Sequence, residues 1–241
     1  LRDFRNHTRP NCKTCGKIKI MQLNSFQQEI IAKTKEMIRA KFSGEGTGHD
    51  WWHMQRVFDI ATKIGTEEKA DLFIVQLGAL LHDIADHKFH DNDHSIGPKK
   101  AKEWMEECGV DEKSQELVLN IVKEISYKGA KVETPMSSPE GKIVQDADRL
   151  DAIGAIGIAR AFAYGGSKKR EIYNPDVEPV LHSSFEEYKN SGGNTINHFF
   201  EKLLLLKNRM NTDAGKKMAA DRHQFMASYL DHFFAEWKGE K

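Results

Sequence analysis

The sequence predicts an all-α protein, built as one helical domain around a central site. Three observations lead to this fold class. Capping residues such as Ser, Thr, Asp and Asn stand before stretches with a helical apolar period, and glycines close many of those stretches. Turn dipeptides and period-two alternation typical of β-hairpins are nearly absent. A chain of 241 residues is also long enough to bury a sizeable core.

Helix boundaries follow from the same signals, taken in chain order. Asn24 or Ser25 is expected to cap the first helix, and Gly65 is expected to stop the second. Ser138-Pro139-Glu140 combines a capping Ser, Pro at the first helical position and an acid in the first turn. The expected helices cover residues 24–42, 50–64, 67–83, 95–108, 111–126, 138–164, 195–206 and 212–237.

Residues 1–20 differ from the rest of the chain, because they are polar and basic and show no helical period. We interpret residues 1–20 as a disordered leader and residues 21–241 as the domain. Cys12 and Cys15 have the spacing of half a zinc knuckle, but one CxxC pair is a weak signal without a second. With Cys108 they make three cysteines, too few for a disulfide framework.

The charge balance narrows the classes of partner. Lys and Arg together number 36, and Asp and Glu together also number 36. This neutrality gives no electrostatic reason to expect nucleic acid or an anionic membrane as the partner. No apolar run approaches the roughly 20 residues needed to cross a bilayer, and the leader has no secretory hydrophobic stretch. We therefore expect a soluble, cytoplasmic protein with a small-molecule partner, either as a monomer or as a homodimer.

Three segments place His or Asp in otherwise apolar helical sequence. They are Gly48-His-Asp-Trp-Trp-His-Met-Gln-Arg-Val57, Leu81-His-Asp-Ile-Ala-Asp-His87 and Val144-Gln-Asp-Ala-Asp-Arg-Leu-Asp151. Ionised carboxylates on an apolar helix face are costly unless they are paired or bind a metal. Neutral imidazole together with carboxylate suits Zn, Fe, Mn or Ni, so the segments indicate a metal site.

Each of these residues also has a simpler interpretation. A single His on a helix is more often a hydrogen-bonded core residue than a metal ligand. Asp83 would serve equally well as a cap at a helix end. Asp148 and Arg149 would each serve equally well as one partner of an ordinary surface ion pair. Taken singly, none of these residues indicates function; their order and spacing together do.

The order His53…His82-Asp83…Asp148 resembles the signature of the HD-domain phosphohydrolase superfamily, and most closely its small nucleotide-pyrophosphohydrolase-like members. Further segments similar to that family are Ile125-Ser-Tyr-Lys-Gly129, Asn197-His-Phe-Phe-Glu-Lys-Leu-Leu204 and Arg222-His-Gln-Phe-Met226. The similarity spans residues 25–238. It implies a single HD-type helical domain with metal-dependent phosphohydrolase activity. The expected substrate is a phosphate ester or anhydride, with a nucleotide as the first candidate.

The resemblance implies that His53, His82, Asp83 and one Asp of the third segment hold one divalent ion: Mn, Mg, Zn, Ni or Fe. Asp146 and Asp148 point about 200° apart on a helix, so we do not expect both to bind the same ion. The wider superfamily has its ligand in an Ala-Asp-x-Leu context, which selects Asp148 and leaves Asp146 in reserve. Neighbouring helical side chains diverge, so His82 and Asp83 reach one ion only near a helix end or with oblique rotamers.

The same resemblance supplies candidates for catalysis and substrate contact. Asp86, one helical turn after Asp83, is a candidate to orient the attacking water or take its proton, and His87 is a second candidate. Arg56, one turn after His53, is expected to place positive charge near the reacting phosphate. The expected substrate-binding cations are Lys128, Lys202 and Arg222. Each of these long basic side chains is more often a solvated surface group.

Two other functions remain open from the sequence. A degenerate HD module would bind a nucleotide or a protein partner without hydrolysis, although the complete ligand set together with Asp86 argues for catalysis. A di-iron oxygenase of HD type would need extra His ligands, and His87, His90 and His94 are available for that role. The metal content and its stoichiometry would separate these alternatives.

Overall fold

The computed structural model describes residues 22–44, 50–85, 95–184, 186–187 and 193–241. Within these ranges every regular element is a helix, so the predicted all-α fold class is confirmed. The elements are α1 (Ser25–Phe42), α2 (Trp51–Glu68), α3 (Leu72–Leu81), α4 (Ile96–Glu107), α5 (Glu112–Glu124), α6 (Pro139–Asp151), α7 (Gly154–Ser167), α9 (Thr195–Glu201), the 3-10 helix η2 (Leu203–Arg209) and α10 (Asp213–Trp237).

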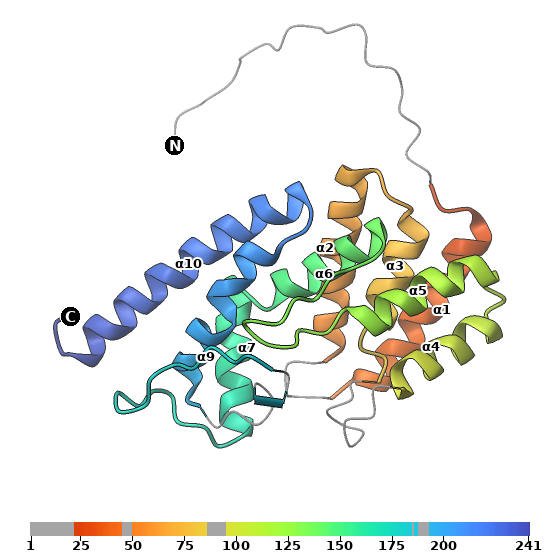
Figure 1. Cartoon of the computed structure of the whole chain (residues 1–241). Helices are drawn as coiled ribbons and strands as arrows, with labels where there is room; N and C mark the ends of the chain where they lie inside the picture. Colours follow the sequence, from red (N-terminus) through yellow and green to blue (C-terminus); the bar gives the residue numbers. More distant parts are fainter. Residues whose placement is uncertain (1–21, 45–49, 86–94, 185, 188–192) are drawn as a thin grey trace, which may run out of the picture.

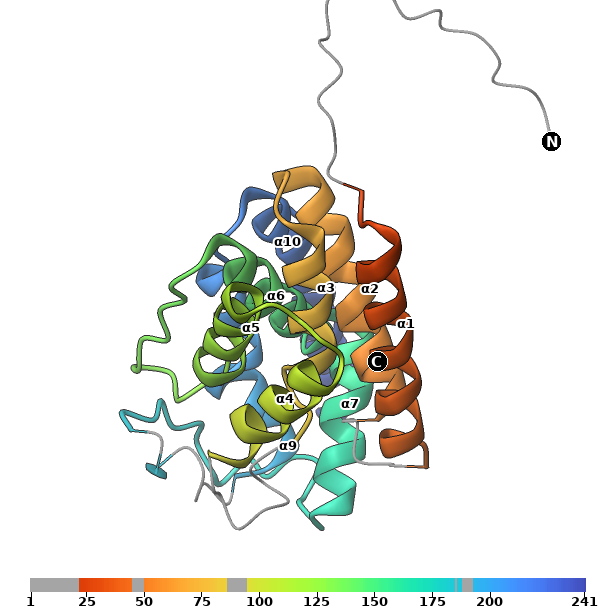
Figure 2. The same cartoon turned by 90° about the vertical axis from the view of Figure 1, so that its right-hand side faces the viewer.

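Helix α2 is central to the arrangement, because it packs against both α3 and α6. Helices α1, α4 and α5 lie on one side of this central group, and α7, α9 and α10 lie on the other (Figure 1). The turned view places α1 beside α2 at one edge of the molecule (Figure 2). The central packing brings together the three elements that carry the predicted metal ligands.

The core is a continuous apolar cluster with contributions from most of the helices. Fully buried members include Met54 of α2, Leu77 of α3, Ile121 of α5, Leu150 of α6 and Phe199 of α9. Burial of such side chains contributes about 25 cal/mol per Å² of apolar surface removed from water. The shared core therefore fixes α2, α3 and α6 relative to one another, and with them the backbone of the candidate site.

Side-chain caps begin several helices at the predicted residues. Asn24 caps α1 in a capping box with Gln27. The hydroxyl of Ser138 accepts a hydrogen bond from the third residue of α6, and Pro139 takes the first helical position. Thr212 caps α10 in the same manner. The predicted starts of these three helices are confirmed.

The predicted stop of the second helix at Gly65 is wrong. Helix α2 continues past Gly65 to Glu68, and Gly65 itself is buried. A Cβ atom at this position would lie 3.1 Å from Cδ2 of Leu72, so the glycine permits close packing between α2 and α3. The helix ends instead at Lys69, which adopts a left-handed conformation with a φ of 59°.

The third helix begins later than the predicted Glu67. Helix α3 starts at Leu72, because the carboxylate of Asp71 accepts hydrogen bonds from two backbone amides of its first turn. The helix ends at Leu81, close to the predicted end. This end matters for the site, since His82 directly follows it.

The single helix predicted over residues 138–164 is in fact two helices, α6 and α7. The chain turns between them at Gly154, whose φ of +76° lies in the left-handed region that glycine adopts without strain. The apolar period runs through this turn, which is why the sequence pattern did not reveal it. As a result α7 runs in a new direction, and its Arg160 contacts Asp151 at the end of α6.

The helix predicted over residues 195–206 changes type part of the way along. Helix α9 ends at Glu201, and Lys202 has non-helical dihedrals with φ −140° and ψ −60°. The chain continues as the 3-10 helix η2 up to Arg209. Lys202 therefore lies at the joint between two elements rather than within one helix.

Several predictions concern residues outside the described ranges. They are the disordered leader, the Cys12–Cys15 pair, and the polar residues Asp86, His87, His90 and His94. Cys108 lies within the described part and is a free, half-buried thiol. No helix in the part that the structure describes is long and apolar enough to cross a membrane.

Candidate metal centre

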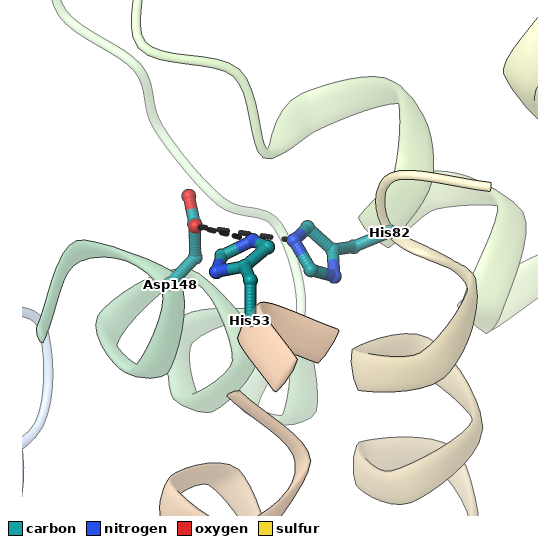
Figure 3. Close-up of side chains that lie close together, drawn as sticks. All are labelled: His53, His82 and Asp148. Carbon is teal, nitrogen blue, oxygen red and sulfur yellow. Dashed lines mark ion pairs between the residues drawn. The ribbon is translucent and has the colours of Figure 1, made fainter. Parts of the chain in front are cut away.

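Three of the predicted metal ligands converge from separate helices. His53 lies in the first turn of α2, His82 directly follows α3, and Asp148 lies near the end of α6. One ligand atom from each residue lies within 4.8 Å of the other two. Figure 3 shows both imidazole rings beside the carboxylate of Asp148. The two imidazoles are buried and the carboxylate is partly exposed, so the cluster is open to water on the side of Asp148.

Asp83 lies beside both imidazoles, although the tight three-residue cluster consists of His53, His82 and Asp148. The Oδ2 atom of Asp83 lies 3.7 Å from Nε2 of His53 and 3.6 Å from Nε2 of His82. Because α3 ends at Leu81, His82 and Asp83 lie in the turn beyond the helix, where consecutive side chains need not diverge. The helix end therefore explains how two neighbouring residues approach one point.

Asp146 and Asp148 have entirely different surroundings. The Oδ1 atom of Asp148 lies 3.7 Å from Nε2 of His53 and 3.9 Å from Nε2 of His82. Asp146 is fully buried and accepts hydrogen bonds from four donors in the two residues that precede α10. The structure thus places Asp148 beside the imidazoles and uses Asp146 to fix the start of α10.

In each imidazole, Nδ1, the ring nitrogen that faces away from the cluster, has a hydrogen-bond partner. Nδ1 of His82 lies 2.8 Å from the carbonyl oxygen of Ala79, so this nitrogen must carry the proton and donate it. Nδ1 of His53 lies 2.8 Å from Oδ2 of Asp151. In each neutral ring the lone pair of Nε2 then faces the carboxylates of the cluster. Nε2 of His82 is buried and has no hydrogen-bond partner within the described residues.

This donor set fits a divalent ion. A neutral imidazole lone pair that faces carboxylate oxygens is repelled by them unless a cation lies between the groups. Atoms bound to one ion at roughly 2.1 Å lie at most about 4.2 Å apart. The four imidazole–carboxylate separations run from 3.6 to 3.9 Å. Two imidazoles with two carboxylates suit Zn, Fe, Mn or Ni.

The electrostatics of His53 agree with a cation site. Burial lowers the pKa of His53, but the hydrogen bond to Asp151 and the nearby carboxylate of Asp83 outweigh that effect and raise the pKa above its usual value. The raised pKa means that negative charge dominates around the ring. The same excess of negative charge would attract a metal ion.

Asp151 is a buried carboxylate that three side chains approach. Besides the contact from His53, Arg56 donates Nε to Oδ1 at 2.6 Å and Nη2 to Oδ2 at 3.0 Å. Arg160 donates Nη1 to Oδ2 at 2.8 Å. Burial raises the pKa of Asp151, but the hydrogen bonds from His53 and Arg56 hold it well below its usual range. Asp151 is therefore ionised and fixes the orientation of the His53 ring.

The predicted substrate-binding residues take up different positions. Arg222 donates to the backbone carbonyl of Leu150, at the end of the helix that carries Asp148. Lys128 is exposed on the segment after α5. Nζ of Lys202 lies 5.0 Å above the ring centre of Tyr127. The two lysines thus lie outside the helices that carry the candidate ligands, whereas the guanidinium of Arg222 contacts one of them.

The remaining predicted site residues, Asp86 and His87, fall outside the described ranges. Two further residues, Asp151 and Arg160, belong to the site but were not predicted from the sequence. A signal for Asp151 was available, because it follows Asp148 by three residues and so shares its helix face. Arg160 gave no such signal, since its position depends on the turn at Gly154.

Comparisons with known proteins agree with this geometry. The sequence matches the HD domain family over residues 51–153. It is 40% identical over 195 residues to the uncharacterized protein YpgQ of Bacillus subtilis (strain 168), a match that covers 80% of this chain and 86% of YpgQ. The crystal structure of an HD-superfamily hydrolase from Bacillus thuringiensis superposes with a TM-score of 0.69 and 40% identity, covering 88% of this chain and 98% of that chain.

The crystal structure of B. subtilis YpgQ in complex with ADP superposes with a TM-score of 0.67 and 34% identity, covering 88% of this chain and 96% of that one. The matched HD domain extends from α2 to the end of α6, so it includes His53, His82, Asp83 and Asp148. The match in sequence, the superposition along most of the chain and the convergence of these side chains point the same way. The chain belongs to the HD-domain phosphohydrolase superfamily.

Proposed function

We propose that this protein hydrolyses a phosphate ester or anhydride of a nucleotide in a metal-dependent reaction. One observation carries the proposal: His53, His82, Asp83 and Asp148 converge, and the Nε2 atoms of the imidazoles face the two carboxylates. An ion with six coordination positions, such as Mn or Mg, would keep two positions beyond these four ligands, one for water and one for a phosphoryl oxygen.

A divalent ion bound to these residues would supply Lewis acidity and lower the pKa of water towards neutrality. The residues of the chain then have separate tasks. His53 and His82 would hold the ion as neutral imidazoles, and Asp151 would keep the proton of His53 on Nδ1. We propose Asp86, with His87 as the second candidate, as the group that orients the attacking water or takes its proton.

The charges around the site favour an anionic substrate. The guanidiniums of Arg56 and Arg160 bind Asp151, and Arg222 donates to the carbonyl of Leu150 next to it, so positive charge already offsets part of the negative charge of the carboxylates. A divalent ion bound to the cluster would add two further positive charges. A phosphate group would then be attracted to the site even though the whole chain is neutral.

A nucleotide is the substrate class with the most support. B. subtilis YpgQ, a relative that covers most of the chain, forms a complex with ADP. The partial exposure of Asp83 and Asp148 leaves a route for a substrate to reach the ligands from solvent. Either phosphate or pyrophosphate would be released, depending on which bond lies at the metal.

A substrate panel tests the proposal. Nucleoside mono-, di- and triphosphates, cyclic nucleotides and simple phosphomonoesters should be incubated with the protein and Mn, Mg, Zn, Ni or Fe. Release of phosphate or pyrophosphate from at least one nucleotide, with at least one of these ions, is expected. Nucleotide binding without turnover under every condition would instead support a binding module, and two irons per chain would support an oxygenase.

A further inference from the structure

Asp151 carries one negative charge, yet two guanidiniums bind it. Arg56 already engages both carboxylate oxygens through Nε and Nη2, a bidentate contact that is sufficient to neutralise the charge. Arg160 adds a second contact through Nη1. Within the part of the chain that the structure describes, this is the one hydrogen bond of the Arg160 side chain. Most of its five N–H donors therefore remain available.

The position of Arg160 is costly without a further anion. Its side chain is only 17% exposed, although the carboxylate that it contacts is already paired with Arg56. A guanidinium that is largely withdrawn from water needs hydrogen bonds and negative charge to offset its lost hydration. Arg160 shares the single negative charge of Asp151 with Arg56. A bound phosphate would supply the additional acceptors and negative charge that Arg160 needs.

Asp151 links Arg160 to the candidate metal centre. One carboxylate oxygen, Oδ2 of Asp151, is 2.8 Å from Nδ1 of His53 and 2.8 Å from Nη1 of Arg160. The positive charge of Arg160 acts directly on the His53 ring. The same oxygen thus fixes a metal ligand and a guanidinium that keeps spare donors.

We propose that Arg160 is a substrate-binding residue that donates to a phosphoryl oxygen of the bound nucleotide while Asp151 holds its guanidinium in place. The inference rests on the proposed function and deepens it, because it names a contact between this chain and the phosphate chain of the substrate. Arg56 serves mainly to neutralise Asp151. In Arg160, by contrast, the remaining N–H donors would be used by the substrate.

Paired binding measurements test this role. The Arg160→Met variant keeps an unbranched apolar stem in place of the side chain but loses all its donors. ADP in the presence of saturating Mn²⁺, pyrophosphate with Mn²⁺, and Mn²⁺ alone serve as probes in calorimetric titrations. Loss of a charge-assisted contact to phosphate should weaken both phosphate probes by about 10- to 100-fold. Affinity for Mn²⁺ alone should stay within about threefold, because Arg56 still binds both oxygens of Asp151 and keeps it against His53.

A matched control removes an arginine from elsewhere on the surface. Arg39 is exposed on α1, so the Arg39→Met variant loses the same charge without touching Asp151. It should bind every probe as the wild type does. If it weakened the phosphate probes as much as Arg160→Met, the effect would be one of overall charge and the inference would be overturned.

Other outcomes are equally decisive. Unchanged phosphate binding in the Arg160→Met variant overturns the inference and leaves the proposed function standing. A joint loss of Mn²⁺ and phosphate affinity would make Arg160 a support for Asp151, which also overturns it. If circular dichroism shows that the Met variant is unfolded, Arg160→Lys replaces it. That variant should bind Mn²⁺ normally and ADP several-fold more weakly, and normal ADP binding would count against the inference. A wild type that binds neither phosphate probe would remove the proposed function as well.

Discussion

Nδ1 of His53 lies 2.8 Å from Oδ2 of Asp151, and this contact joins a candidate metal ligand to a buried carboxylate. Asp151 is itself anchored by Arg56 and Arg160, so the carboxylate that orients the ring of His53 is held in place. The proton is held on Nδ1 and the lone pair of Nε2 faces the cluster. The geometry of the proposed metal site therefore depends on a residue that would not itself touch the ion.

The Asp151→Asn substitution should weaken metal binding without removing a ligand. An amide in place of the carboxylate orients His53 less firmly and lowers its basicity, which typically costs about 10- to 100-fold in metal affinity. Calorimetric titration with Mn²⁺, with circular dichroism to verify folding, measures the effect. The exposed Asp231→Asn is the control and should bind normally. A folded Asp151→Asn variant with wild-type Mn²⁺ affinity would show that the contact is only structural.

The Asp148→Asn substitution should be at least as severe for the metal. Oδ1 of Asp148 lies 3.7 Å from Nε2 of His53 and 3.9 Å from Nε2 of His82, so its charge would act directly on an ion held by these imidazoles. We expect metal affinity to fall by about 100-fold or more, beyond the usual effect of a supporting residue. Elemental analysis of the purified variant gives the metal content. Full metal occupancy in this variant would reverse the assignment of the third-segment ligand.

The Asp146→Asn substitution should affect stability and leave the metal in place. Asp146 accepts hydrogen bonds from four donors at the start of α10, and Asn cannot accept from all of them. Loss of charge-assisted hydrogen bonds at a buried site should lower the free energy of unfolding by about 2–4 kcal/mol. Urea denaturation of the metal-free protein measures this change. Loss of bound metal from the folded variant would contradict the separation of roles between Asp146 and Asp148.

The Gly154→Ala substitution should destabilise the turn between α6 and α7. Gly154 has a φ of +76°, and a Cβ there would approach Cγ of Arg222 to 3.0 Å. Strain of this kind lowers the free energy of unfolding by about 1–3 kcal/mol. Gly166 of the same helix has nothing within 4 Å of a new Cβ, so Gly166→Ala is a matched control that should not destabilise. Equal melting temperatures for both variants would contradict this explanation of the turn.

The sequence predicted the parts of the fold that local chemistry decides. Asn24, Ser138 and Thr212 cap helices through their own side chains, and a cap acts within a few residues of itself. The helix boundaries that were predicted wrongly involve two glycines whose role depends on tertiary packing. Gly65 looked like a helix stop but allows α2 and α3 to approach, and Gly154 turns the chain within an unbroken apolar period.

The candidate site shows the same division. The ligand set came from the resemblance to a family, because periodicity could not explain how His82 and Asp83 approach one ion. That approach depends on the end of α3, a property of the folded chain. The contact between Asp151 and Arg160, which supports His53, was not predicted for the same reason. It depends on the turn between α6 and α7, and the sequence pattern had predicted a single helix there.

Metal dependence of nucleotide hydrolysis tests the central claim most directly. The protein is stripped with excess chelator, and the release of phosphate or pyrophosphate is followed with the best nucleotide of the panel, before and after a divalent ion is restored. We predict that activity disappears in chelator and returns with the ion in the wild type, and that the Asp148→Asn variant stays inactive under both conditions. Undiminished hydrolysis by the wild type in excess chelator would contradict the account.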